Sequence, residues 1–115
     1  MTNLQVNAEK HGEVILLRLK GFLDAHNHGL FRNALEKYAA EGHTRFVVDF
    51  SELVYIGSSG IEVILSRIQP LRDRGGDILL SGMSPKIYKV FDLLGLPALF
   101  VICKDAAEAL AKAHG

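Results

Sequence analysis

The chain has 115 residues, a length typical of one domain, and 49% of them are hydrophobic, so we expect residues 1–115 to form a single domain around one core. Thirteen basic and thirteen acidic residues cancel, which excludes the strong electrostatic field that would draw the chain onto nucleic acid or an anionic membrane. A partner must therefore be recognised by local shape and charge.

Three features indicate the compartment. Cys103 is the one cysteine, so a disulfide within the chain is excluded. The first five residues have neither the charged nor the apolar region of a signal peptide. The longest apolar candidates, residues 14–17 and 93–102, are short or interrupted, whereas a membrane-spanning helix needs about 20 residues. We expect a cytoplasmic protein with no direct membrane insertion.

The first predicted element is a β-hairpin. Residues 4–8 alternate between apolar and polar side chains, and residues 14–19 form a more apolar run after a turn at His11-Gly12. Between residues 27 and 40, apolar side chains recur at three- and four-residue spacing, which predicts an amphipathic helix that Gly42 ends. The continuous apolar run 46–48 is typical of a strand covered on both faces, and we expect it to be the central strand.

A connection through residues 51–53 is expected to lead into a second helix, whose apolar stripe comprises Ile61, Ile64, Leu65, Ile68 and Leu71. Pro70 removes a backbone donor, so we expect a kink or a helix end near it, with Gly75-Gly76 closing the segment.

The last third of the chain continues the alternation. We expect a strand at residues 78–80, a helix that begins at Pro85 and ends at Gly95, a strand at 100–102 and a helix at 106–113. The order β-β-α-β-α-β-α-β-α indicates an α/β fold with a mixed sheet of about five strands and about four helices.

The segment 49–62 is the most informative about chemistry, because a strand leads into two serines and a glycine that open a helix. Ser59 with Glu62 three residues later fits a capping box, in which the serine oxygen accepts a helix-end N–H and the carboxylate reaches back. Ser58 is then expected outside the helix, with a free hydroxyl near the positive end of the helix dipole. A phosphate group can be accommodated there.

Two other interpretations of these serines were weighed. Ser-Ser-Gly is also an ordinary capping sequence, and the local pattern by itself favours that role. A hydrolase nucleophile elbow needs glycines two residues before and two after the serine, but Ile56 precedes Ser58 and Ile61 follows Ser59 at those positions. The chain also lacks the glycine-lysine pattern of a phosphate-binding P-loop.

We expect no metal ion and no cofactor. His26 and His28 are two residues apart, so they do not face each other on a helix, and no cysteine or third histidine has ligand spacing to them. Cys103, at the end of an apolar strand, is typical of a small core residue. The pattern leaves open whether a nucleotide binds.

Six segments, in this order along the chain, resemble the STAS domain family. Residues 21–24 are similar to the family's Gly-x-Leu-Asp, and residues 47–51 to its hydrophobic strand ending in Asp-Leu/Phe-Ser. Residues 56–61 resemble the family's Asp-Ser-Ser-Gly-Leu phosphorylation loop. The downstream matches are Gly75-Gly76, Ser84-Pro85 and residues 91–96 with the pattern Phe-x-x-x-Gly-Leu. The resemblance covers nearly the whole chain and implies a single STAS domain.

The resemblance also implies a function, that of an anti-sigma factor antagonist, which is a binding protein and not an enzyme. In such family members the serine that matches Ser58 is phosphorylated by an anti-sigma factor that is itself a serine kinase, and a PP2C-type phosphatase removes the phosphate. The unphosphorylated form binds the anti-sigma factor and frees the sigma factor. This chain departs from the family pattern at Gly57, where the family often has aspartate.

The expected partner surface is centred on this loop and on the helix start beside it, because the carboxyl ends of parallel strands meet at one edge of a sheet. It comprises Asp24, His26, Gly57, Ser58, Ser59, Gly60 and Glu62. The alternative from another functional class is a stand-alone STAS subunit of a lipid-trafficking ABC transport complex. A neighbouring kinase or phosphatase gene would favour the antagonist, and a neighbouring permease and ATPase gene would favour the transport subunit.

Overall fold

The computed structural model describes residues 3–114, in which strands and helices alternate as the sequence predicts. The strands are β1 (Leu4–His11), β2 (Val14–Leu23), β3 (Arg45–Ile56), β4 (Asp77–Ser81) and β5 (Ile102–Cys103). The helices are α1 (His28–Ala40), α2 (Ser58–Asp73), α3 (Pro85–Leu93) and α4 (Ala106–His114), and a short 3-10 helix, η1 (Leu96–Ala98), follows α3.

All five strands of the described chain form one mixed sheet in the order β1-β2-β3-β4-β5. β1 and β2 are antiparallel, as the predicted hairpin requires, and the other neighbouring pairs are parallel. The hairpin turns at Gly12, whose φ of 64° lies in the left-handed region that glycine adopts without strain. β3 is the central strand, which confirms that prediction.

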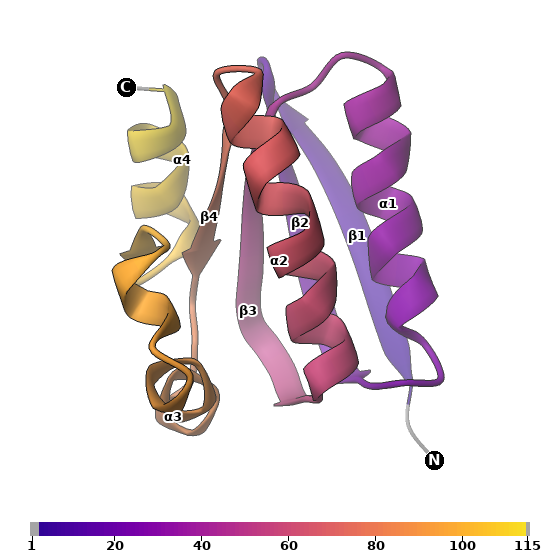
Figure 1. Cartoon of the computed structure of the whole chain (residues 1–115), viewed down its shortest axis with the longest axis vertical. Coiled ribbons are helices and arrows are strands. Elements are labelled where there is room, and N and C mark those ends of the chain that lie inside the picture. Colours follow the sequence, from indigo (N-terminus) through magenta and orange to yellow (C-terminus); the bar gives the residue numbers. More distant parts are fainter. Residues whose placement is uncertain (1–2, 115) are drawn as a thin grey trace.

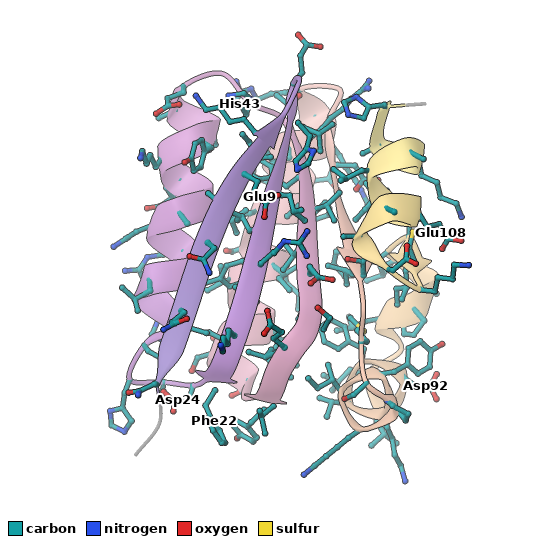
Figure 2. The ribbon with its side chains drawn as sticks, turned by 180° about the vertical axis from the view of Figure 1, so that it is seen from behind. Glu9, Phe22, Asp24, His43, Asp92 and Glu108 are labelled. Carbon is teal, nitrogen blue, oxygen red and sulfur yellow. The ribbon has the colours of Figure 1, made fainter. Side chains whose placement is uncertain are left out.

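The helices cover the two faces of the sheet unequally (Figure 1). α1 and α2 lie side by side on one face, where Phe31 and Ile64 join the larger core together with residues of α3. α4 lies on the opposite face, where Ala109 packs against Val47 and Leu79 in a smaller core. β1 is left uncovered on this second face, and Glu9 points outward from it (Figure 2).

The structure corrects the predicted strand bounds. β3 continues to Ile56, through residues 51–53 that were expected to form a connection. It stays paired with β2 across two register shifts, and these interrupt the alternation that would have revealed the longer strand. The last strand is residues 102–103 and not 100–102, because only Ile102 and Cys103 pair with β4, opposite Leu80 and Ser81. Phe100 packs in the larger core ahead of this strand.

The predicted helices are confirmed, with their ends defined by local chemistry. α2 continues through the exposed Pro70 and ends three residues later, at Asp73. Ser84 caps α3, because its Oγ accepts the Ile87 N–H at 3.2 Å, and Pro85 occupies the first helical position. Gly95, with φ 71°, leads out of this helix into η1.

Candidate functional site

The site lies where β2 and β3 end next to each other. Their pairing runs to Leu23 and Ile56, and the Gly57 N–H then donates to the Leu23 carbonyl at 2.8 Å. This bond holds the start of α2 against the segment that follows β2. Figure 2 shows Asp24 and Phe22 at this edge of the sheet. The two segments that the sequence predicts to be neighbours are therefore neighbours in the fold.

Gly57, and not Ser59, is the N-cap of α2. Its φ of −95° and ψ of 174° are extended, its carbonyl accepts the amides of Gly60 and Ile61, and no side chain caps this helix end. The predicted capping box of Ser59 and Glu62 is therefore wrong. Because the backbone bonds of the sheet edge continue as far as Gly57, the helix starts directly after it.

The two serines differ in exposure. Ser58 is the first residue of α2, and not outside the helix as predicted, but its side chain is exposed, whereas Ser59 is half-buried. Within residues 3–114, neither hydroxyl has a hydrogen-bond partner. The first amides of a helix carry partial positive charge, so the Ser58 hydroxyl lies where an anionic group is stabilised. Exposure, and not capping, distinguishes Ser58 from Ser59.

The two glycines of the predicted surface have different surroundings. Gly60 is buried, and a Cβ there would lie 2.5 Å from Leu23 Cγ, so its lack of a side chain lets α2 pack closely on β2. Gly57 is half-buried, and a Cβ would lie 3.3 Å from the Tyr55 hydroxyl and in ordinary contact with the Tyr55 ring and the Leu23 carbonyl. Gly60 therefore positions the site, while Gly57 lies at its surface.

Asp24 and His26 lie in a turn that precedes α1. One Asp24 carboxylate oxygen accepts the His26 N–H at 2.9 Å, and the Asp24 N–H donates to Asn27 Oδ1 at 2.9 Å. The Asn27 side chain also donates to the Phe22 carbonyl at 2.8 Å. These bonds fix the turn and leave the His26 side chain exposed.

Apolar side chains that the sequence analysis did not single out lie near the same edge. Val54 and Tyr55 are exposed, and the Phe22 ring lies 6.5 Å from that of Tyr55. A prediction that β3 extends to residue 56 would have revealed this pair, because the pairing of β2 and β3 places Tyr55 directly beside Phe22.

A groove between α1 and α2 was also missed. It has a volume of about 230 Å³, and its lining residues are His28, Arg32, Ser59, Glu62, Val63 and Ser66. The signal was the four-residue spacing of His28 and Arg32, which places both on one face of α1. Which face α1 turns toward α2 depends on tertiary packing, so the sequence could not place them beside Ser59.

The described residues contain no group of three or more histidine, cysteine or acidic side chains arranged to hold a metal ion. Burial raises the pKa of the Cys103 thiol, which therefore stays protonated at neutral pH. A larger hollow of about 460 Å³ lies at the opposite end of the sheet and is lined by Arg45, Arg74 and the residues around Gly42. In residues 3–114 no helix has the length and apolar character needed to cross a membrane.

The STAS domain family model matches residues 5–109. The "Anti-sigma F factor antagonist" of Paenibacillus polymyxa is 28% identical, over 94% of this chain and 93% of that protein. The solved structure of the anti-sigma factor antagonist SpoIIAA in its unphosphorylated form superposes with a TM-score of 0.85 at 26% identity, covering 96% of this chain and 97% of that one. The phosphorylated form of the Bacillus cell fate determinant SpoIIAA superposes with a TM-score of 0.74 at 27% identity, covering 96% and 98%.

Proposed function

Because this chain belongs to the STAS domain family, we propose that it is an anti-sigma factor antagonist that binds an anti-sigma factor serine kinase and is inactivated by phosphorylation of Ser58. The observation that carries the proposal is the exposed Ser58 side chain at the first position of α2, without a hydrogen-bond partner in the described part of the chain. The relative from Paenibacillus polymyxa that is named an anti-sigma F factor antagonist aligns over 94% of this chain.

The geometry suits a modification site better than a catalytic one. A kinase can reach the Ser58 hydroxyl because nothing in the described chain covers it. Within residues 3–114, no histidine or carboxylate is hydrogen-bonded to Ser58 to activate it as a nucleophile. In this proposal the protein is a substrate and a binding partner, and not an enzyme, and it acts in the cytoplasm. A PP2C-type phosphatase restores the binding form.

The partner surface comprises the exposed or half-buried residues around Ser58. Gly57, Ser59 and Glu62 belong to the start of α2, and Asp24 and His26 to the turn that the Gly57 N–H holds against it. Gly60 contributes by bringing the helix close to β2. A phosphate on Ser58 adds a charge of about −1.5 to −2 in the middle of this surface. Covering that charge with a partner that lacks a matching cation is unfavourable.

The test is to incubate the protein with ATP and each candidate anti-sigma kinase from the same genome, and to follow its mass. We expect one added phosphate, which phosphopeptide mapping assigns to Ser58. Ser58→Ala should bind the same kinase without being modified, and Ser59→Ala is the matched control that should still accept phosphate. Modification mainly at Ser59 would refute the assigned site, and the absence of both binding and modification would refute the function.

A further inference from the structure

The groove between α1 and α2 lies directly beside the phosphorylation site. Ser58 and Glu62 are four residues apart on α2, so they lie on one face of this helix, and Glu62 lines the groove. Ser59, the next residue after Ser58, lines it too. A partner that covers Ser58 therefore also reaches the groove.

The opposite wall of the groove carries the positive charge of Arg32. His28 and Arg32 line it from the first turns of α1. One turn farther along, Glu36 of α1 pairs with Arg67 of α2, and this ion pair joins the two helices beyond the groove. Arg32 has no such partner: within residues 3–114 its guanidinium makes no hydrogen bond and no ion pair. Even Glu62, across the groove, is not within ion-pair distance of it.

Over residues 3–114, most of the other arginines, unlike Arg32, have a hydrogen-bond or ion-pair partner. Arg18, Arg45, Arg67 and Arg72 each have a carboxylate or carbonyl partner. Besides Arg32, only Arg74 has a side chain with no recorded partner in the described chain, and it lines the hollow at the opposite end of the sheet. Among the described residues, Arg32 is therefore the one unpaired arginine beside the proposed partner surface.

The size of the groove indicates what enters it. A volume of about 230 Å³ is less than the roughly 300–1,000 Å³ of pockets that enclose small molecules. It is sufficient for a side chain that a protein inserts from outside. The Arg32 guanidinium is a cation that donates hydrogen bonds, and the carboxylate among the lining residues, Glu62, does not pair with it, so the complementary side chain is a carboxylate from the partner.

We propose that the α1–α2 groove is the part of the partner surface that receives an acidic side chain of the anti-sigma kinase, with Arg32 as the residue that binds its carboxylate. This inference rests on the proposed function, because it assigns chemistry to the same interface. It also explains how phosphorylation of Ser58 would weaken binding. A phosphate on Ser58 would lie near the bound carboxylate of the partner and repel it.

The test measures the affinity and association rate of the kinase that binds the parent protein. Arg32→Glu should raise the Kd at least about tenfold, and Arg32→Gln should lower the association rate and its dependence on salt. Arg32→Lys, which keeps the charge, should recover most of the affinity. The matched control is Arg74→Glu, an identical charge change at an exposed, unpaired arginine at the far end of α2, which should leave the Kd within about twofold. Unchanged thermal melts would show that both variants fold.

The outcomes separate this inference from the function on which it rests. If the parent binds and Arg32→Glu binds equally well, the groove is not part of the interface, although the antagonist function stands. If Arg32→Glu and Arg74→Glu weaken binding equally, the attraction is a general effect of net charge and the groove assignment is wrong. If the parent binds none of the candidate kinases, the proposed function fails and this inference fails with it.

Discussion

Gly57 is the residue at which this chain departs from the STAS loop pattern, and the structure allows the aspartate that the family often has there. The backbone of Gly57 has the extended angles usual for an N-cap, and an added Cβ would displace only the Tyr55 hydroxyl. We expect Gly57→Asp to stabilise the protein by a few tenths of a kcal/mol, because aspartate caps a helix better than glycine. Denaturant melts measure this difference.

Gly60→Ala provides the contrast in the same helix turn. Its Cβ would lie 2.5 Å from Leu23 Cγ in a packed core, which should cost about 1–3 kcal/mol. If Gly57→Asp lost as much stability as Gly60→Ala, the N-cap would be assigned to the wrong residue.

Glu9 lies on the uncovered face of the sheet and makes the stability depend on pH. Its carboxylate lies 3.0 Å from His11 Nε2 and accepts the Arg18 Nε–H at 2.8 Å, and these two hydrogen bonds lower the pKa of Glu9 below its ordinary value of 4.5. Folding thus favours the ionised form, so the stabilisation is present above the unfolded-state pKa and is lost as the pH falls through the lower, folded pKa.

Glu9→Gln should therefore lower the melting temperature slightly at neutral pH, and the difference from the parent should vanish in acid, once the parent's carboxylate is protonated as well. Thermal melts at a series of pH values measure this. Because the Glu9 and Arg18 side chains are half-exposed, their ion pair should stabilise the fold as a surface pair does, by at most about 1 kcal/mol. A difference that stayed the same at every pH would mean that the ion pairs contribute nothing.

At the scale of elements, the nearly fully buried carboxylate of Asp49 in β3 contacts side chains of the neighbouring strands β2 and β4. It accepts Ser81 Oγ–H of β4 at 3.0 Å and Ser51 Oγ–H at 2.6 Å, and Arg18 of β2 lies 3.6 Å from it. Asp49→Ala would leave the fully buried Ser81 hydroxyl without its acceptor. We expect a loss of about 1–3 kcal/mol in the free energy of unfolding.

Glu52→Ala is the control for Asp49→Ala on the same strand. Glu52 is exposed and lies 3.9 Å from the exposed Lys20 ammonium, so its removal should cost between about 0 and 1 kcal/mol. Chemical denaturation of both variants gives the comparison. Similar losses would show that the buried Asp49 bonds do not stabilise the sheet.

The elements that the sequence predicted well are those with uninterrupted periodicity. The hairpin, the central position of β3 and the four helices follow from apolar spacing and from the glycine and proline residues that end them. The second half of β3 could not be predicted, because its register shifts break the alternation. The helix start at Ser58 was misplaced because a hydrogen bond from Gly57 to Leu23, 34 positions earlier in the chain, decides where α2 begins.

Of the candidate site, only the residues that lie close together in the sequence or at neighbouring strand ends could be predicted. Ser58 and its neighbours were singled out by their place at a predicted helix start and by the resemblance of residues 56–61 to the STAS phosphorylation loop, and Asp24 because parallel strands end at one edge. Arg32 and Phe22 became visible only in three dimensions, since the groove needs the packing of α1 on α2 and the aromatic pair needs the β2–β3 register.

At the scale of the whole molecule, phosphorylation should change binding without changing the fold. A negative group at an exposed helix N-terminus is stabilising by ~0.3–1 kcal/mol, too little to rearrange a sheet with a packed core on each face. We expect Ser58→Glu to melt like the parent and to shift amide NMR signals only around residues 23–28 and 56–62. Shifts throughout the sheet would indicate a global rearrangement instead of a local switch.

The most direct measurement is the affinity of the cognate anti-sigma kinase for the same protein before and after complete phosphorylation at Ser58, determined by calorimetric titration. Burying the phosphate dianion under a partner that offers no matching cation costs several kcal/mol of binding free energy. Each ~1.4 kcal/mol raises the Kd tenfold. We therefore predict that phosphorylation weakens binding about a hundredfold or more, and that removal of the phosphate by a phosphatase restores it. Equal affinities for the two forms would contradict the assignment of Ser58 as the switch.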